Sequence, residues 1–509
     1  MVRINSVNCL GEMFKIDISF NKNYVLTMDT DINIVGLPDA SVRESKERVR
    51  AAIVNSGYEF PLGRITINLS PADVRKNGTL LDLPIALGIL MESNQIIKRD
   101  LEKFIVFGEL SLSGELVGIK GAIPIIFEGD SKKKKNYIFP LDNLSEMRHF
   151  TLGNFYPFKS LEQVVSFITN EDLLPYKNRK QINKGKEKFK LDFGDIIGQY
   201  TAKRAMEIVA VGRHNIFLFG SPGSGKSMLA KALPSILPPL TIEEQKEIAK
   251  IYSVSGLWNK GYFIERPFRA PHHTTTKTAL IGGGNEIKVG EITLAHNGVL
   301  FLDEILEFSN ELLEVLRQPL EEGIINISRL RENYTLPSKF ILVGAFNPCK
   351  CGRFMEDENN SLCECTEYEK RRYLNKISRP LMDRIDLFNY VPRIKYEEIT
   401  DKKDYIDSDK MRKKVLEAAE RQSFRLKDTI YNYNSEIVGK DVFRICNISS
   451  KGKKVLEQYY NKYNITLRGY VKIIKVARTI ADLEGSDEIA DYHIIEALQY
   501  RKNAFGEII

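Results

Sequence analysis

One glycine-rich stretch of the sequence has the residue types and spacing needed to bind phosphate. It fits the pattern GxxxxGK[ST] with Gly220, Ser221, Pro222, Gly223, Ser224, Gly225, Lys226 and Ser227. An apolar run at 215–219 precedes it and predicts a strand, and a helix-forming run at 228–233 follows it. In this context backbone N–H groups can surround a phosphate at a helix N-terminus. Lys226 would then reach the β- and γ-phosphate oxygens, and Ser227 would bind Mg²⁺. A chance glycine turn carrying Lys-Ser is the weaker alternative.

Two acidic residues supply the second half of such a site. Asp303 and Glu304 end the apolar run 298–302. Ligands of open α/β sheets bind at the carboxyl ends of strands, so Asp303 would hold Mg²⁺ through water and Glu304 would polarise an attacking water. Adjacent acids at a strand end also cap helices, but the upstream phosphate loop favours catalysis. Asn347 ends another apolar run and is placed to orient the water or contact the γ-phosphate, unless it is a plain turn cap.

One arginine stands out farther along the chain. Arg384 lies in a short polar break between two apolar runs. From there an arginine could reach the γ-phosphate held by a neighbouring subunit and neutralise charge that develops during transfer. A surface salt bridge is an equally good interpretation of the spacing alone.

Four of the six cysteines form a cluster, Cys349, Cys351, Cys363 and Cys365. Thiolates from two short loops can close a tetrahedral structural zinc site. The CxC spacing is less usual than CxxC, so free thiols stay open as an alternative. We expect such a zinc knuckle to stiffen the chain after Asn347 without a catalytic role.

Length and composition describe an ordinary globular protein with several domains. The 509 residues are 43% hydrophobic and 28% charged, with a net charge of +7, which is compatible with nucleic acid but too weak to argue for it alone. There is no apolar run long enough for a membrane span and no apolar signal segment. We therefore expect a cytoplasmic protein with no membrane partner.

The division of the chain follows changes in composition. Residues 1–175 alternate strand-like and helix-like segments, 176–192 form a lysine-rich linker, 193–395 hold the phosphate-binding motifs, and 396–509 are helical. Through its segments 34–38, 68–75 and 108–114, the first part resembles the proteolytic domain of Lon proteases in the non-catalytic form carried by magnesium-chelatase-like ATPases. Asp82 falls near the position of the nucleophilic serine, and Ile123 falls where the partner lysine is expected. Because a Ser–Lys pair needs both groups, we expect no protease activity.

Two segments inside the third part are candidate pore elements. Residues 282–288 form the first, a glycine-rich run that ends in Lys288. Residues 324–336 predict a hairpin with a polar tip. Lys288, Arg329 and Arg331 could contact DNA phosphates in a central channel, and the alternative is an ordinary charged surface.

Several motifs together resemble the YifB/ComM group of magnesium-chelatase-like AAA+ ATPases, over nearly the whole chain. They are the segments 269–276, 280–284, 295–304, 347–352 and 476–483. The resemblance implies an α/β AAA+ core with a Lon-protease-like N-terminal domain and a C-terminal helical lid. It also implies a homohexamer with ATP at its subunit interfaces and Ile197 and Gly198 on the adenine side. It makes Asn347 the first sensor, Arg384 the arginine finger and Arg468 the second sensor. Arg379 stands where the group often has glycine, so either Arg379 or Arg384 could be the finger.

The function implied by the resemblance is a DNA motor. Such a motor would bind ATP and Mg²⁺ and act on single-stranded, duplex or branched DNA, as a branch-migration helicase in recombination and natural transformation. The alternative is an ATPase that remodels a protein partner, as the motor subunit of magnesium chelatase does.

Overall fold

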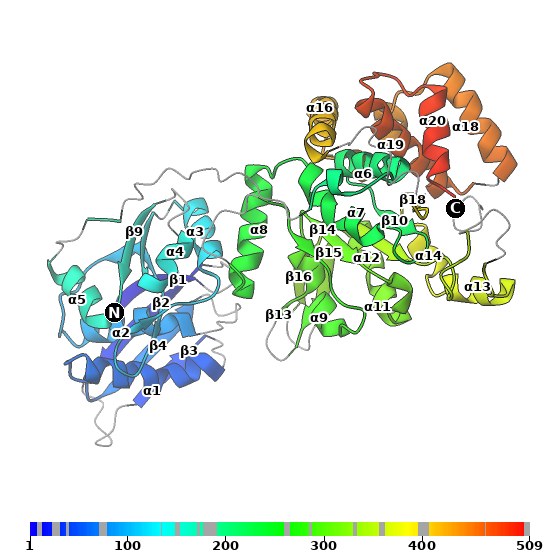
Figure 1. Cartoon of the computed structure of the whole chain (residues 1–509). Coiled ribbons are helices and arrows are strands. Elements are labelled where there is room, and N and C mark those ends of the chain that lie inside the picture. The colour runs from blue at the N-terminus through cyan, green and yellow to red at the C-terminus, as the bar shows by residue number, and fades with distance from the viewer. Residues whose placement is uncertain are drawn as a thin grey trace. The chain divides into compact units, whose positions relative to one another are not determined.

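The computed structural model describes residues 1–7, 13–22, 31–36, 40–70, 79–133, 135–147, 153–170, 174–176, 191–258, 265–284, 288–328, 333–355, 362–394, 407–463 and 465–502. These residues form two compact units (Figure 1). Unit 1 comprises Met1–Lys184 and Lys246–Phe263, and unit 2 comprises Gly185–Gln245 and Ile264–Ile509. The apolar run at 24–28, which predicts a strand, and nearly all of the lysine-rich linker lie outside the described residues.

Unit 1 is built on a seven-stranded mixed sheet in the order β3-β4-β2-β1-β5-β8-β9. Strands β1, β2 and β4 pair antiparallel, and the remaining neighbours pair parallel. The strands are β1 Val2–Val7, β2 Met13–Asn21, β3 Asp31–Val35, β4 Arg64–Ser70, β5 Leu101–Val106, β8 Asn136–Pro140 and β9 Asn154–Phe158, with a separate hairpin of β6 Glu109–Leu110 and β7 Leu116–Val117.

Helices complete the core of unit 1. They are α1 Ala40–Asn55, α2 Asp82–Glu92, α3 Ala122–Ser131, α4 Leu144–Met147 and α5 Leu161–Asn170. Ten of the eleven residues of α2 are buried because it packs between α1 and strands β1 and β2 (Figure 1). Helix α8 (Ile242–Ser255) begins in unit 2, and its residues from Lys246 onward belong to unit 1. There the carbonyl of Ser253 accepts from the Gly121 N–H at 3.1 Å.

Asp82 and Ile123, which stand near where a Lon protease has its serine and lysine, have structural roles. Asp82 is fully buried and forms an ion pair with Arg48, whose Nε lies 2.8 Å from its carboxylate. Burial raises the pKa of Asp82, although Arg48 opposes that shift. Ile123 is also fully buried. A carboxylate held by a guanidinium cannot act as the activated hydroxyl of a Ser–Lys pair.

Unit 2 contains a five-stranded parallel sheet in the order β11-β14-β17-β10-β18. The strands are β11 Phe268–Arg269, β14 Val299–Leu302, β17 Ile341–Phe346, β10 Ile216–Phe219 and β18 Leu387–Tyr390. Alternate residues of β10 enter two different cores, with Ile216 in one and Phe217 in the other. Burial on both faces explains why these strands are continuous apolar runs in the sequence.

Short helices and two hairpins surround this sheet. The helices are α6 Tyr200–Gly212, α7 Lys226–Ala232, α9 Lys277–Ile281, α10 Glu291–Leu294, α11 Asn310–Val315, α12 Arg317–Glu322, α13 Glu367–Leu374 and α14 Arg379–Met382. The hairpins are β12 Gly282–Gly283 with β13 Lys288–Val289, and β15 Ile324–Ser328 with β16 Asn333–Pro337. They lie together, since a Cβ added at Gly282 would be 3.4 Å from Cδ1 of Ile327. The antiparallel pairing of β15 with β16 confirms the hairpin predicted at 324–336.

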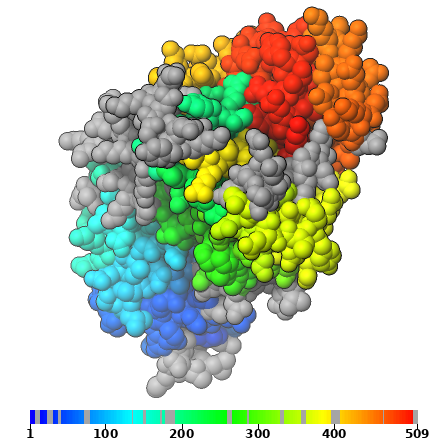
Figure 2. Space-filling view, turned by 45° about the vertical axis from the view of Figure 1, so that its right-hand side comes forward, coloured from blue at the N-terminus to red at the C-terminus, as the bar shows by residue number. Residues whose placement is uncertain are grey.

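The C-terminal part of unit 2 is the expected helical lid. It contains α16 Ser408–Leu426, α17 Asp441–Ile445, α18 Ser450–Tyr463, α19 Leu467–Leu483 and α20 Asp491–Gln499. Helices α18 and α20 lie side by side at its surface (Figure 2, orange and red). The lid shares one hydrophobic core with α6 and one face of the sheet. It is therefore packed on the ATPase core within one unit.

A buried charge network joins the lid to the core. The Glu244 carboxylate contacts Arg213 at 2.6 Å and Arg266 at 3.0 Å, and it accepts from the Tyr433 hydroxyl at 3.0 Å. The guanidinium of Arg213 also lies 4.1 Å from the centre of the Tyr433 ring. Burial by itself would raise the pKa of Glu244, but the two arginines lower it to about 2.

The low pKa of Glu244 makes the stability of the protein depend on pH. Because its folded pKa of about 2 lies below the ordinary 4.5, its ion pairs stabilise the fold fully above pH 4.5. The contribution, about 3 kcal/mol at most, is lost as pH falls from about 4.5 toward 2. We expect Glu244→Gln to lower stability at pH 6 and to flatten its decline toward pH 3.5, as followed by urea unfolding. Glu243→Gln, at the exposed neighbouring position, is the control and should have the same stability as the wild type at each pH. If Glu244→Gln also unfolded like the wild type at each pH, the network would contribute nothing to stability.

Candidate functional site: a nucleotide site at the sheet edge

Three loops meet at the carboxyl edge of the parallel sheet in unit 2. The glycine-rich loop follows β10, the acidic pair follows β14, and Asn347 follows β17. The side chains of these loops touch: the Lys226 amine lies 3.2 Å from Oδ1 of Asn347, and the Ser227 hydroxyl donates to Asp303 at 2.8 Å. The fold thus brings together residues separated by up to 121 positions in the sequence.

The glycine-rich loop is shaped to receive an anion. Gly225 has a φ of 96° and stands immediately before α7, a backbone conformation that other residues rarely adopt. The Lys226 amine folds back and donates to the carbonyls of Gly220 at 2.7 Å and Ser221 at 2.8 Å. The buried Ser221 hydroxyl has no hydrogen-bond partner among the described residues.

Phosphate oxygens bound in the loop would offset the cost of burying the charged Lys226 amine. Burial lowers the pKa of Lys226 to about 8, against the opposing attraction of Asp303 and Glu304. An amine with this environment gains from any additional negative charge. A triphosphate is a ligand of that kind, so the charge and the loop geometry both fit it.

Ser227 and Asp303 form the pair expected of a magnesium site. Hydroxyl and carboxylate oxygens are hard ligands that suit Mg²⁺, and here they lie 2.8 Å apart at an exposed edge. Glu304 follows with a φ of 49°, in the left-handed region that non-glycine residues seldom occupy. Such backbone strain is concentrated at functional sites, and here it ends β14 abruptly next to the phosphate loop.

Gln199 is a residue of this site to which the sequence motifs assigned no role, although it directly follows the residues expected on the adenine side. Its side-chain amide donates to the carbonyls of Ser224 at 3.1 Å and Pro392 at 2.7 Å. It directly follows Ile197 and Gly198, so it ties the expected adenine side to the phosphate loop. Its buried Oε1 atom has no partner within the part of the chain described. The only signal in the sequence was its position beside a short recognised motif.

Arg384 lies at the opposite edge of the sheet. It precedes β18, which runs parallel to β10 with Leu387 opposite Ile216, and the Asn215 side chain donates to its carbonyl at 3.5 Å. The phosphate loop follows the other end of β10, roughly 13 Å away at about 3.3 Å per strand residue. Arg384 therefore stands away from the phosphate loop of its own chain.

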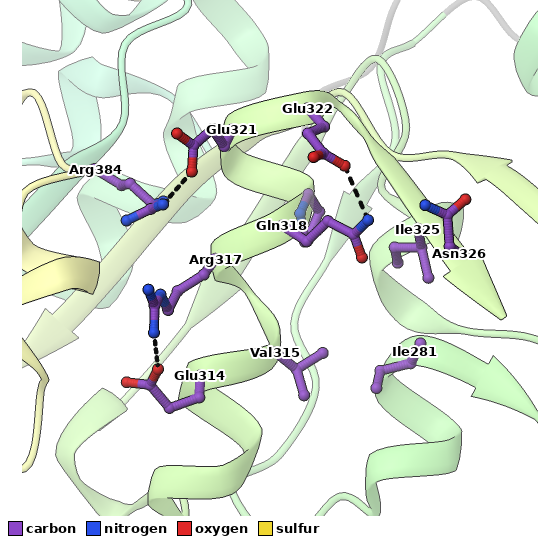
Figure 3. Close-up of a pocket in the computed structure, with 11 residues that line it drawn as sticks. Ile281, Glu314, Val315, Arg317, Gln318, Glu321, Glu322, Ile325, Asn326 and Arg384 are labelled. Atoms are coloured by element: carbon purple, nitrogen blue, oxygen red, sulfur yellow. Dashed lines mark hydrogen bonds and ion pairs between the residues drawn. The ribbon is translucent and has the colours of Figure 1, made fainter. Parts of the chain in front are cut away.

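Arg468 lies near Arg384, because both arginines pair with the same acidic residue. Both guanidiniums form ion pairs with Glu321, Arg468 at 3.6 Å. Arg384 also donates to the Pro380 carbonyl at 2.6 Å, and its buried Nε has no partner in the described ranges. Figure 3 shows Arg384 and Glu321 at the wall of a cavity of about 500 Å³. The two arginines thus form one cluster, and Arg379 stands exposed at the start of α14.

The four clustered cysteines come together in space. Their sulfur atoms all lie within 4.8 Å of one another, beside the loop that carries Asn347. Of the expected DNA-contacting residues, Lys288 is exposed on β13. Arg329 and Arg331 lie outside the described residues.

The parallel sheet, the phosphate loop and the helical lid together define an AAA+ P-loop ATPase core. Three family models match the chain. They are described as magnesium chelatase, subunit ChlI, over residues 192–399, as subunit ChlI of Mg-chelatase over 24–143, and as magnesium chelatase, subunit ChlI C-terminal, over 406–501. Competence protein ComM of Haemophilus influenzae is 40% identical over 92% of this chain and 91% of its own length. The uncharacterized protein YifB of Escherichia coli is 38% identical over the same shares. The chain belongs to the YifB/ComM group of magnesium-chelatase-like AAA+ proteins.

Magnesium-chelatase subunits match a smaller share of the chain at lower identity. The magnesium-chelatase subunit ChlI of Guillardia theta is 26% identical over 33% of this chain and 54% of its own length. The fold class predicted from the sequence is confirmed, with an α/β AAA+ core, a Lon-protease-like N-terminal domain and a helical lid. Among the described residues no helix has the length and apolar character to span a membrane.

The contact between Asn347 and Lys226 predicts a defect in hydrolysis rather than in binding. Asn347→Ala removes a polar group from the end of β17 but leaves the glycine loop intact. We expect kcat for ATP to fall by roughly 10²-fold, the cost of removing one preorganised polar group. Affinity for a fluorescent ATP analogue should change by less than about threefold. Asn389→Ala, on β18 and bonded within its own strand, is the control. Equal losses in both variants would contradict a role for Asn347.

Proposed function

We propose that this protein is an ATP-driven DNA motor that works as a homohexamer in the cytoplasm. The reaction is Mg²⁺-dependent ATP hydrolysis, and the work is branch migration of recombination intermediates. A zinc ion held by Cys349, Cys351, Cys363 and Cys365 is a structural part of the same proposal. The division into residues 1–175, 176–192, 193–395 and 396–509 stays a prediction.

The observation that carries this proposal is the separation of Arg384 from its own phosphate loop. The site next to Lys226 needs a cation to offset charge that develops on the transferred phosphoryl group. Arg384 and Arg468 lie across the sheet, and only a second copy packed head to tail can bring them to that site. Head-to-tail contacts that close give rings. The position of the arginines therefore supports a ring with shared sites.

Each residue has a defined task in this account. Lys226 and the backbone N–H groups of the glycine loop bind the β- and γ-phosphates. Ser227 and Asp303 would hold Mg²⁺, which when bound offsets phosphate charge. Glu304 polarises the attacking water, and Asn347 orients it. In the assembled ring, Arg384 and Arg468 release Glu321 and bind the phosphate held by the neighbouring subunit. Hydrolysis in one subunit therefore alters a contact made by the next.

The DNA part of the proposal has separate support. One relative is named a competence protein, and competence is the state in which cells take up DNA. The two hairpins lie side by side in unit 2, and one of them exposes Lys288. Adjacent hairpins with basic residues suit phosphate contacts in a central channel. If DNA leaves the ATPase rate unchanged, remodelling of a protein partner becomes the better hypothesis.

Shared active sites predict that two inactive variants restore activity when mixed. Arg384→Ala keeps its own phosphate loop, and Glu304→Gln keeps its own arginine. In a random equal mixture, about a quarter of the head-to-tail interfaces combine a functional loop with a functional arginine. We expect each variant alone to lose more than about tenfold in ATPase rate, since an arginine of this kind is worth about 10³-fold or more. The mixture should recover a substantial fraction, and no recovery would mean that Arg384 acts within its own chain.

Strand exchange on a four-way DNA junction tests the motor function itself. Wild-type protein with ATP should convert the junction into its exchanged products, whereas Glu304→Gln should bind the junction without converting it. Lys288→Glu with Arg331→Glu should weaken DNA binding and leave the ATPase rate without DNA unchanged, because neither residue has a task in nucleotide binding or hydrolysis in this account. Lys453→Glu with Lys454→Glu, at two exposed lysines of α18, is the charge-matched control. An active ATPase that neither binds nor exchanges DNA would refute the proposal.

A further inference from the structure

The sulfur atoms of the cysteine cluster have the spacing of a single-metal site. Cys349 and Cys351 are 3.3 Å apart, Cys349 and Cys363 are 3.8 Å apart, and Cys351 and Cys363 are 3.7 Å apart. Four thiolates at 2.3 Å from one tetrahedral zinc ion are separated by about 3.8 Å. Cys365 completes the set of four ligands.

The surroundings of the cluster suit a charged metal site. Cys349 is buried and accepts from the Phe354 N–H at 3.4 Å, a contact that orients its sulfur. The buried Lys370 amine lies over the Phe354 ring at 4.2 Å. A zinc ion with four thiolates carries a net negative charge, so a nearby lysine stabilises it.

The cluster also touches the phosphate loop. A Cβ added at Gly352 would lie 2.7 Å from both Cγ and Cδ of Pro222, so the turn between the cysteines packs directly on the glycine-rich loop. Gly352 has a φ of 78°, which lets the chain make this close approach. Two residues before Cys349, Asn347 contacts Lys226. The cysteine segment therefore contacts the nucleotide site at two points.

We propose that the four cysteines bind one Zn²⁺ and that the metal-bound segment braces the phosphate loop through the contact of Gly352 with Pro222. Without the metal, the segment loses the bonds that close it, and the position of Pro222 is no longer fixed from that side. Zinc thus supports ATP binding, in addition to stiffening the loop. This inference rests on the proposed ATPase function but not on its DNA role.

Metal analysis with a binding measurement tests the proposal in the full-length protein. Protein purified without chelators should carry about one zinc per chain, and Cys363→Ser with Cys365→Ser should abolish it. The same variant should bind a fluorescent ATP analogue roughly tenfold more weakly, as expected when a supporting contact is lost. Cys446→Ser removes a buried cysteine far along the chain and should retain both zinc and affinity. Absence of metal, or iron in its place, overturns the zinc assignment.

A glycine substitution tests the contact apart from the metal. Gly352→Ala should keep its zinc and still weaken binding of the ATP analogue, because the added methyl group displaces Pro222. Gly439→Ala is the matched control, since Gly439 has a similar φ of 61° but open space around the added atom. If Gly352→Ala binds nucleotide like Gly439→Ala, or if loss of zinc leaves affinity unchanged, the bracing role is wrong. Zinc content and nucleotide affinity are measured without DNA, so this result is independent of any failure in strand exchange.

Discussion

The direction of the parallel sheet in unit 2 is the constraint on which the functional account depends. Three of the five parallel strands, β10, β14 and β17, carry the loops for phosphate, metal and water at one edge, and Arg384 precedes β18 at the other. The four residues of β10 separate the phosphate loop from the end of the sheet where Arg384 lies. In the proposed account the same parallel arrangement that creates the nucleotide site therefore leaves a single chain without the arginine that the site needs.

Buried charged residues link the segment that carries Arg384 to the helical lid. Asp386, two residues after Arg384, pairs with Lys472 of α19 at 2.8 Å, and Arg501 donates to its carbonyl at 3.2 Å. Burial opposes ionisation of Asp386, yet Lys472 and His214 hold its pKa well below the ordinary value. Removing one partner of such a pair would leave a buried charge uncompensated. These contacts therefore tie the lid to the Arg384 segment, which in the proposed account would let the lid pass the effect of hydrolysis to a neighbour.

Local patterns in the sequence predicted most of the fold and one half of the site. Continuous apolar runs indicated β10, β14 and β17. The helical character of the C-terminal part was also predicted, and α16 to α20 lie there. Contacts between distant segments could not be predicted, since no periodicity encodes them. Gln199 beside Ser224, and Glu321 between two arginines, are of this kind.

The central claim is that each triphosphate is shared by two subunits, and the rate of hydrolysis per subunit as a function of protein concentration tests it most directly. Mass photometry of the same samples, with ATP and DNA present, gives the state of assembly. The account predicts that the rate per subunit rises with the fraction of assembled rings and is negligible for monomers. A monomer that hydrolyses ATP at the full rate would contradict it.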